Sequence, residues 1–211
     1  VGTYTITPSG AAASNYTVSF VPADFTITQA ALTVTASDQT KVYGATDPVL
    51  TYTITGFQGT DTEDDLDTAV SISRAAGEDV GTYTITPSGA AASNYTVSFV
   101  TADFTITQAA LTVTADTATK VYGATDPVLT YTITGFQGTD TEADLDIALS
   151  ISRAEGEDVG TYTITPTPVI SIIIPVDVIN FEEAASNYSV SFVTADFTIT
   201  QAPLTVTADA A

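Results

Sequence analysis

Carboxylates are the groups in this sequence best able to do chemistry, and they gather in two clusters that lie 79 residues apart. Ca²⁺ takes about six to eight oxygen ligands and is often bound by such groups. The candidate ligands of a structural calcium ion are Asp61, Glu63, Asp65, Asp140, Glu142 and Asp144. Their spacing does not match an EF-hand loop, and Asp64 of the first cluster is Ala143 in the second. We therefore expect no cofactor, with structural calcium and a plain solvated acidic surface as the two alternatives.

The missing residue types exclude several kinds of catalytic machinery. The 211 residues contain no His and no Cys, which excludes Ser-His-Asp and Cys-His machinery and ordinary zinc sites. Paired carboxylates for glycoside hydrolysis are always available in so acidic a chain, but no Trp offers a sugar platform. We expect no catalytic residue and no enzyme.

The charge balance excludes further partners. Four basic residues stand against twenty-five acidic ones, so the formal net charge is −21. This charge gives no footprint for nucleic acid or for anionic lipid. No apolar run reaches the ~20 residues of a membrane-spanning helix, so we expect no membrane insertion.

The few cations are placed regularly. Lys41 and Arg74 recur as Lys120 and Arg153. A single Lys before a strand is compatible with an isopeptide bond to Asn or Asp, and the alternative is a surface cation that pairs loosely with nearby acids.

The sequence repeats itself with a period of 79 residues. The string GTYTITP begins at Gly2, Gly81 and Gly160, and KVYGATDP begins at Lys41 and Lys120. Residues 31–87 and 110–166 differ at seven of 57 positions. We place the joints at the Gln-Ala steps and predict four segments: residues 1–30 as the end of a repeat, 31–109 (repeat 1) and 110–202 (repeat 2) as complete repeats, and 203–211 as the first strand of another.

Strict alternation predicts strands within each repeat. Apolar side chains alternate with Thr in Leu50–Ile54, Thr82–Thr86, Tyr95–Phe99 and Phe104–Thr107. This period of two sends the apolar side chains to one face and Thr to the other. The predicted core residues are Tyr52, Ile54, Tyr83, Ile85, Tyr95, Val97 and Phe99. Residues 60–69 differ, because a capping Thr or Asp precedes acids that favour a helix start, so they predict one short helix.

These features together resemble a known family. The fragment KVYGATDPVLTYTITGF, the acidic segment after it, and the later strings GTYTITPSGAAASNYTVSF and FTITQAALTVTA resemble the MBG family of mirror β-grasp repeats of the YGX type. Tyr43-Gly44 and Tyr122-Gly123 lie where the family's naming motif lies. The resemblance implies a mostly β fold of tandem β-grasp-like modules, each a small sheet unit with one short helix, in an elongated array. It also implies large exported bacterial surface proteins, often adhesins or extracellular filaments, and it transfers no catalytic residue.

One insertion departs from the family pattern. Repeat 2 replaces residues 88–93 of repeat 1 by residues 167–186, and the apolar insertion itself runs over 167–183. Both faces of a strand built from it are apolar, so it needs cover on both sides. We favour contact with a second chain, and cover by the same chain is the alternative. The predicted interaction residues are Val169, Ile170, Ile172, Ile173, Ile174, Val176, Val178, Ile179 and Phe181.

The leading functional hypothesis is therefore structural. The sequence predicts a repeat segment of an exported bacterial surface fibre or filament, located outside the cell, that gives length and cohesion and self-associates through the insertion. The alternative is an adhesin stalk or binding module that recognises a glycan or a host protein.

Overall fold

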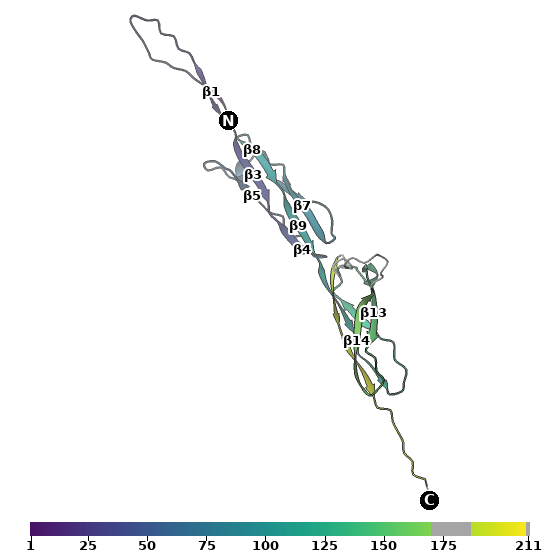
Figure 1. Cartoon of the computed structure of the whole chain (residues 1–211). Coiled ribbons are helices and arrows are strands. Elements are labelled where there is room, and N and C mark those ends of the chain that lie inside the picture. Colours follow the sequence, from purple (N-terminus) through teal and green to yellow (C-terminus); the bar gives the residue numbers. More distant parts are fainter. Residues whose placement is uncertain (170–186, 210–211) are drawn as a thin grey trace, which may run out of the picture. The chain divides into compact units, whose positions relative to one another are not determined.

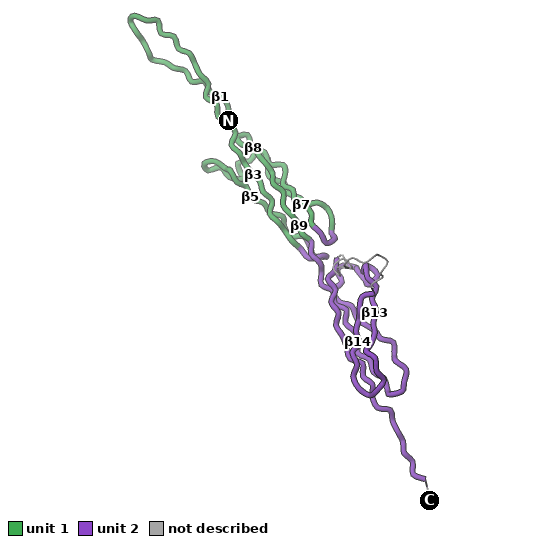
Figure 2. Tube along the Cα trace, viewed as in Figure 1, with its two compact units in different colours: residues 1–40, 47–77, 82–105 green, residues 41–46, 78–81, 106–211 purple. Residues whose placement is uncertain are grey.

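The computed structural model describes residues 1–169 and 187–209, and these form two compact units (Figure 2). Unit 1 contains residues 1–40, 47–77 and 82–105. Unit 2 contains residues 41–46, 78–81 and 106–211. Unit 2 thus includes three short stretches of repeat 1, residues 41–46, 78–81 and 106–109, along with all of repeat 2.

Strands dominate both repeats, as the alternation predicts (Figure 1). Before repeat 1 lie β1 (Gly2–Ile6) and β2 (Ala23–Ile27). Repeat 1 and the residue before it form β3 (Ala30–Ala36), β4 (Gln39–Val42), β5 (Tyr52–Thr55), β6 (Ser71–Arg74), β7 (Gly81–Ser88), β8 (Tyr95–Val100) and β9 (Ala102–Thr107). Repeat 2 and the residue before it form β10 (Ala109–Ala115), β11 (Ala118–Val121), β12 (Tyr131–Thr134), β13 (Ala148–Arg153), β14 (Gly160–Val169), β15 (Tyr188–Val193) and β16 (Ala195–Thr200).

Each repeat builds the same pair of small sheets. The sheet orders are β5-β3-β8 and β4-β9-β7-β6 in repeat 1, and β12-β10-β15 and β11-β16-β14-β13 in repeat 2. The pairs β3/β8 and β10/β15 are parallel, while β3/β5 and β10/β12 are antiparallel. Thr33 faces Ser98 across one parallel pair with 3.1 Å between their hydroxyl oxygens, and Thr112 faces Ser191 in the same way at 3.1 Å. The hydroxyl-bearing face of the alternation is therefore a ladder of side-chain hydrogen bonds.

The core lies under the central strands. Leu32 and Val34 of β3 and Phe104 and Ile106 of β9 are at most 1% exposed. Of the predicted core residues, Ile85 and Tyr95 are buried and most of the others are partly buried. The exception is Phe99, which is 41% exposed, so its prediction is wrong. The reason is position, because β8 is an edge strand and only its first residue, Tyr95, lies fully under neighbouring structure.

The predicted short helix over residues 60–69 is also wrong. The structure has only a three-residue 3₁₀ turn, η1 (Glu63–Asp65), which recurs as η2 (Glu142–Asp144). The Asp65 carboxylate accepts hydrogen bonds from the backbone nitrogen of Thr62 at 2.7 Å and from its hydroxyl at 3.2 Å. The chain becomes extended again at Leu66, with ψ at 135°. Thr62 and Asp65 form the expected cap, but the residues after Asp65 do not continue into a further helical turn.

The β1–β2 pair shows that burial of its aromatic side chains requires more than two strands. Tyr4 is paired with Phe25, as Tyr162 of β14 is paired with Phe197 of β16. Phe25 is 55% exposed, whereas Phe197 is fully buried. The sheet around Phe197 has four strands, whereas β1 and β2 form a sheet of two, so the same side chain stays exposed. In the described part of the chain, no helix is both long and apolar enough to cross a membrane.

Candidate functional site

The Tyr43-Gly44 pair forms a tight turn directly after β4. The backbone nitrogen of Tyr43 donates to Thr107 O at 2.8 Å, and that of Ala45 donates to Val42 O at 3.0 Å. Gly44 has φ at +78°, a backbone conformation that residues other than glycine adopt only at a cost in free energy. We call residues 41–46 the Tyr-Gly loop, and all of them belong to unit 2.

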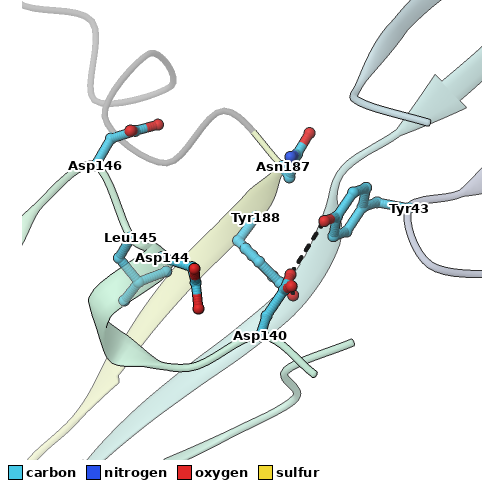
Figure 3. A pocket seen from close by; sticks show the side chains of 7 residues that line it. All are labelled: Tyr43, Asp140, Asp144, Leu145, Asp146, Asn187 and Tyr188. Atoms are coloured by element: carbon cyan, nitrogen blue, oxygen red, sulfur yellow. Dashed lines mark hydrogen bonds between the residues drawn. The ribbon is translucent and has the colours of Figure 1, made fainter. Parts of the chain in front are cut away.

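The Tyr43 side chain binds to the acidic cluster of repeat 2 (Figure 3). Its hydroxyl donates to Asp140 Oδ2 at 3.0 Å, and the hydroxyl of Tyr188 donates to the same oxygen at 2.5 Å. The two tyrosine rings meet edge to face, with centroids 5.4 Å apart and planes at 77°. One carboxylate oxygen therefore ties two phenols from different repeats together.

Gly44 approaches the same site too closely for any side chain. A Cβ atom on Gly44 would lie 2.5 Å from Gln137 Cβ. Gln137 is itself held, because its backbone nitrogen donates to the Tyr188 hydroxyl at 2.9 Å. Glycine is thus required twice at this position, once by the turn and once by the contact.

A second contact joins the same two repeats. Asn187 accepts a hydrogen bond from the backbone nitrogen of Val80 at 2.8 Å and donates one to Asp79 Oδ1 at 3.0 Å. A related contact occurs in unit 1, where the N-terminal ammonium of Val1 donates to Asn94 Oδ1 at 3.2 Å. Val1 lies 79 residues before Val80, so this is the same position of the repeat.

The electrostatics of the site favour neutral phenols. Burial, followed by the hydrogen bond to Asp140, raises the pKa of Tyr43. The same causes raise the pKa of Tyr188 to about 12. Both hydroxyls therefore stay protonated and donate at ordinary pH, and Asp140 accepts.

The site encloses a small pocket of about 180 Å³. It is lined by Tyr43, Asp140, Asp144, Leu145, Asp146, Asn187 and Tyr188. These groups are acids, phenols, an amide and the aliphatic side chain of Leu145. The arrangement can hold two segments of chain together by hydrogen bonds.

The six candidate calcium ligands bind other parts of the chain. Asp61 accepts from the Tyr95 hydroxyl at 2.6 Å, as Asp140 does from Tyr188. Glu63 accepts from Tyr52, and its counterpart Glu142 accepts from Tyr131 at 2.5 Å.

The remaining two candidates, Asp65 and Asp144, close the 3₁₀ turns by accepting from Thr62 and Thr141. Among residues 1–169 and 187–209, no three acidic side chains converge as a metal site. The structure thus brings the candidates to tyrosines and threonines instead of to one another.

Lys41 and Lys120 are buried, so the expectation of a surface cation is wrong for the lysines, whereas Arg74 and Arg153 are partly buried. Lys120 is 7% exposed, and its ammonium contacts Asp126 at 2.6 Å and also Glu157. Arg153 contacts both acids, at 2.6 Å and 2.5 Å, and lies 4.7 Å over the ring of Phe197. In repeat 1, Lys41 pairs with Glu78, and Arg74 pairs with Asp47 at 2.5 Å.

This arrangement favours an ion pair over the isopeptide bond. Arg153 and then Lys120 lower the pKa of Asp126 to about 2, and Asp126 and Glu157 raise the pKa of Lys120. An ionised carboxylate resists attack, and a protonated amine lacks the electron pair that attack needs. At neutral pH both groups are in their charged, unreactive forms.

The predicted interaction residues of the insertion fall almost entirely outside the description. Val169 ends β14, pairs with Ala148 and is 46% exposed. Ile170, Ile172, Ile173, Ile174, Val176, Val178, Ile179 and Phe181 lie outside the described residues.

Sequence reasoning missed the residues that make the contact. It noted Tyr43-Gly44 only as a motif, and it placed neither Gln137 nor Asn187 at a contact between repeats. Part of a signal was available, because Asp61 and Asp140 are kept between the repeats while Asp64 is replaced by Ala143. Three other acid positions of the cluster are also kept, so this signal alone does not single out Asp140.

Comparison with known proteins bears on the resemblance. No curated protein matches the chain. The family model of the MBG domain (YGX type) matches residues 1–26, 32–105 and 111–171, which together are most of the sequence. The matched ranges include both Tyr-Gly pairs. The chain therefore belongs to the MBG domain family of the YGX type, and its residues 41–46 and 120–125 are two copies of one loop.

Proposed function

We propose that this chain is a structural segment of an exported bacterial surface fibre or filament, in which the repeats supply length and the Tyr-Gly loops supply cohesion. The observation that carries the proposal is the binding of Tyr43 and Gly44, from repeat 1, to Asp140, Tyr188 and Gln137 of repeat 2. A repeat that is bound to the next repeat by such contacts can transmit tension along a chain.

The covalent link alone leaves room for motion. Only Gln108 separates β9 from β10. The Tyr-Gly loop and Val80 add further attachments at Asp140 and Asn187. Hydrogen bonds to a charged acceptor contribute about 1.5–3 kcal/mol each when they are sheltered from water. Such a joint resists bending more than a single-residue link does.

The surface chemistry fits a soluble spacer outside the cell. The net charge of −21 opposes aggregation of long exported chains, and the Thr and Ser ladders present hydroxyls on the strand faces. The family is one of repeat modules, and a surface location is the setting that we propose for this one.

Small-angle X-ray scattering of the whole chain tests the proposal. We expect the profile of an extended rod for the natural protein. Gly44→Ala forces a Cβ against Gln137, so it should broaden the distribution of distances as the joint loosens. Gly123→Ala is the matched control, since its φ of +82° is similar and no atom lies within 4 Å of the added Cβ. A compact globular profile for the natural chain would contradict the proposal.

Immunogold labelling of intact expressing cells tests the location. The label should decorate the cell surface, and label confined to the cell interior would contradict a surface role.

The apolar insertion carries the proposal on self-association. We propose that it makes the contacts between subunits, so Ile173→Asp should abolish fibre assembly. Fibres that still assemble would overturn that part of the proposal.

A further inference from the structure

The second Tyr-Gly loop, residues 120–125, has the same turn as the first, but its tyrosine binds no other side chain among the described residues. The backbone nitrogen of Tyr122 donates to Thr200 O at 2.8 Å, and that of Ala124 donates to Val121 O at 3.0 Å. Tyr122 is 51% exposed, and its hydroxyl has no hydrogen-bond partner among the described residues. Val159, the counterpart of the docked Val80, is 50% exposed. We call Tyr122, Gly123 and Val159 the presenting surface.

The site that receives such a loop is also present in unit 1, where no Tyr-Gly loop from residues 1–169 and 187–209 occupies it. The backbone nitrogen of Gln58 donates to the Tyr95 hydroxyl at 2.9 Å, and that hydroxyl donates to Asp61 Oδ2 at 2.6 Å. The Phe57 and Tyr95 rings meet edge to face at 5.9 Å and 82°. Phe136 and Tyr188 of the occupied site meet at 5.8 Å and 84°. The receiving face is therefore preformed, and the incoming tyrosine adds to it without reshaping it.

A third observation indicates which partner binds the presenting surface. Residues 204–209, LTVTAD, are identical to residues 111–116, the main part of β10 and the residue after it. Leu204 and Val206 are 88% exposed, whereas Leu111 and Val113 are fully buried. Residues 204–209 thus carry the sequence of a first strand, but Leu204 and Val206 lack the cover that Leu111 and Val113 have in repeat 2.

We propose that the presenting surface docks one occupant, a further MBG module built on the strand at residues 204–208. In this complex the Tyr122 hydroxyl donates to the carboxylate of that module at the position of Asp61 and Asp140. Gly123 packs on the glutamine at the position of Gln58 and Gln137. Val159 donates its backbone N–H to the asparagine at the position of Asn94 and Asn187.

The proposal rests on the proposed function and names the partner of each joint. The presenting surface and the receiving face are different surfaces, so the contact is heterologous. A heterologous contact is satisfied by the next module and need not close on itself. The same joint can therefore be repeated any number of times along a chain.

An extended chain supplies the test. Residues 40–109 are added directly after Ala211, so that residues 204–211 serve as the first strand and the start of the second in a third module. Hydrogen exchange is then compared between the natural and the extended chain over residues 120–125. We expect exchange of this loop to slow by about tenfold or more in the extended chain, to the level of residues 41–46 in both chains.

Variants and outcomes separate the possibilities. Gly123→Ala should remove the added protection in the extended chain, and its backbone cost from the positive φ is controlled by the same variant of the natural chain. If the third module folds, as judged by circular dichroism, and residues 120–125 exchange as in the natural chain, the proposal is overturned. Protection that appears in the natural chain as its concentration rises would show that a second copy is the occupant, which also overturns it. Fast exchange at residues 41–46 as well would instead overturn the proposed function.

Discussion

The loops Tyr43-Gly44 and Tyr122-Gly123 share sequence and turn geometry but differ in surroundings. Their glycines have φ of +78° and +82°, and each tyrosine nitrogen donates to a threonine carbonyl at 2.8 Å. Tyr43 is partly buried and binds Asp140, whereas Tyr122 is 51% exposed. The glycine of the turn is therefore a local requirement, and the burial of the tyrosine depends on a neighbouring module. One chain thus contains both a docked loop and its undocked control.

The acidic sites of repeat 2 and repeat 1 also differ, because only the site in repeat 2 binds a Tyr-Gly loop of the described residues. Asp140 accepts from two tyrosines, whereas Asp61 accepts from Tyr95. Gln137 and Asn187 are partly buried, whereas Gln58 and Asn94 are exposed. Each substitution at the site in repeat 2 therefore has a matched position in repeat 1, where the same substitution removes fewer contacts.

Loss of the shared acceptor should have the largest effect. Asp140→Ala leaves two phenols without their acceptor, so we expect it to lower the free energy of unfolding of unit 2 by about 3 kcal/mol. Asp61→Ala leaves one phenol and should cost unit 1 about half as much. Urea unfolding followed by circular dichroism measures both. Equal losses would show that Tyr43 adds nothing to the joint.

Filling the contact at Gly44 should have the next largest effect. Gly44→Ala and Gly123→Ala share a backbone cost of about 1 kcal/mol from the positive φ. Only Gly44→Ala also meets Gln137, so it should destabilise unit 2 by about 2 kcal/mol more than the control. Thermal unfolding of both variants gives the difference. Indistinguishable melting curves would contradict the close packing at the joint.

Alkaline pH should loosen the joint by a smaller amount. The folded-state pKa of Tyr188 is about 12, above the ordinary value of 10.0, and the pKa of Tyr43 is also raised. The neutral phenols are the favoured form, so their contribution is complete below the ordinary pKa and is lost as pH rises through the folded-state values. We expect the stability of unit 2 to fall between about pH 10 and pH 12, and less steeply in Tyr43→Phe. A fall that is complete below pH 10 would rule out this cause.

Much of the fold follows from the sequence for a simple reason. The alternation of apolar residues with Thr or Ser fixes both the strands and their faces, as Leu32, Val34 and the Thr33–Ser98 ladder show. The period of 79 then requires the second repeat to copy the first. These are local and periodic signals, which a single sequence carries in full.

The failures came where a long-range contact decides. Phe99 follows the same alternation as Tyr95, but β8 is an edge strand, and no local pattern shows which end of it is covered. Lys120 is buried because Asp126 and Glu157 surround its ammonium, and the second of these lies 37 residues away. The residue that completes the site, Tyr43, is 97 residues from Asp140. The acids were identified, but their tyrosine partners depend on how the repeats meet.

A double-mutant cycle between Tyr43 and Asp140 tests the joint most directly. Tyr43→Phe, Asp140→Asn and the double variant are compared by urea unfolding of unit 2, with Tyr122→Phe in place of Tyr43→Phe as the control cycle. The hydrogen bond at 3.0 Å predicts a coupling energy of about 1–2 kcal/mol for Tyr43 with Asp140, and none for Tyr122 with Asp140. Coupling energies near zero in both cycles would contradict the claim that the Tyr-Gly loop holds one repeat to the next.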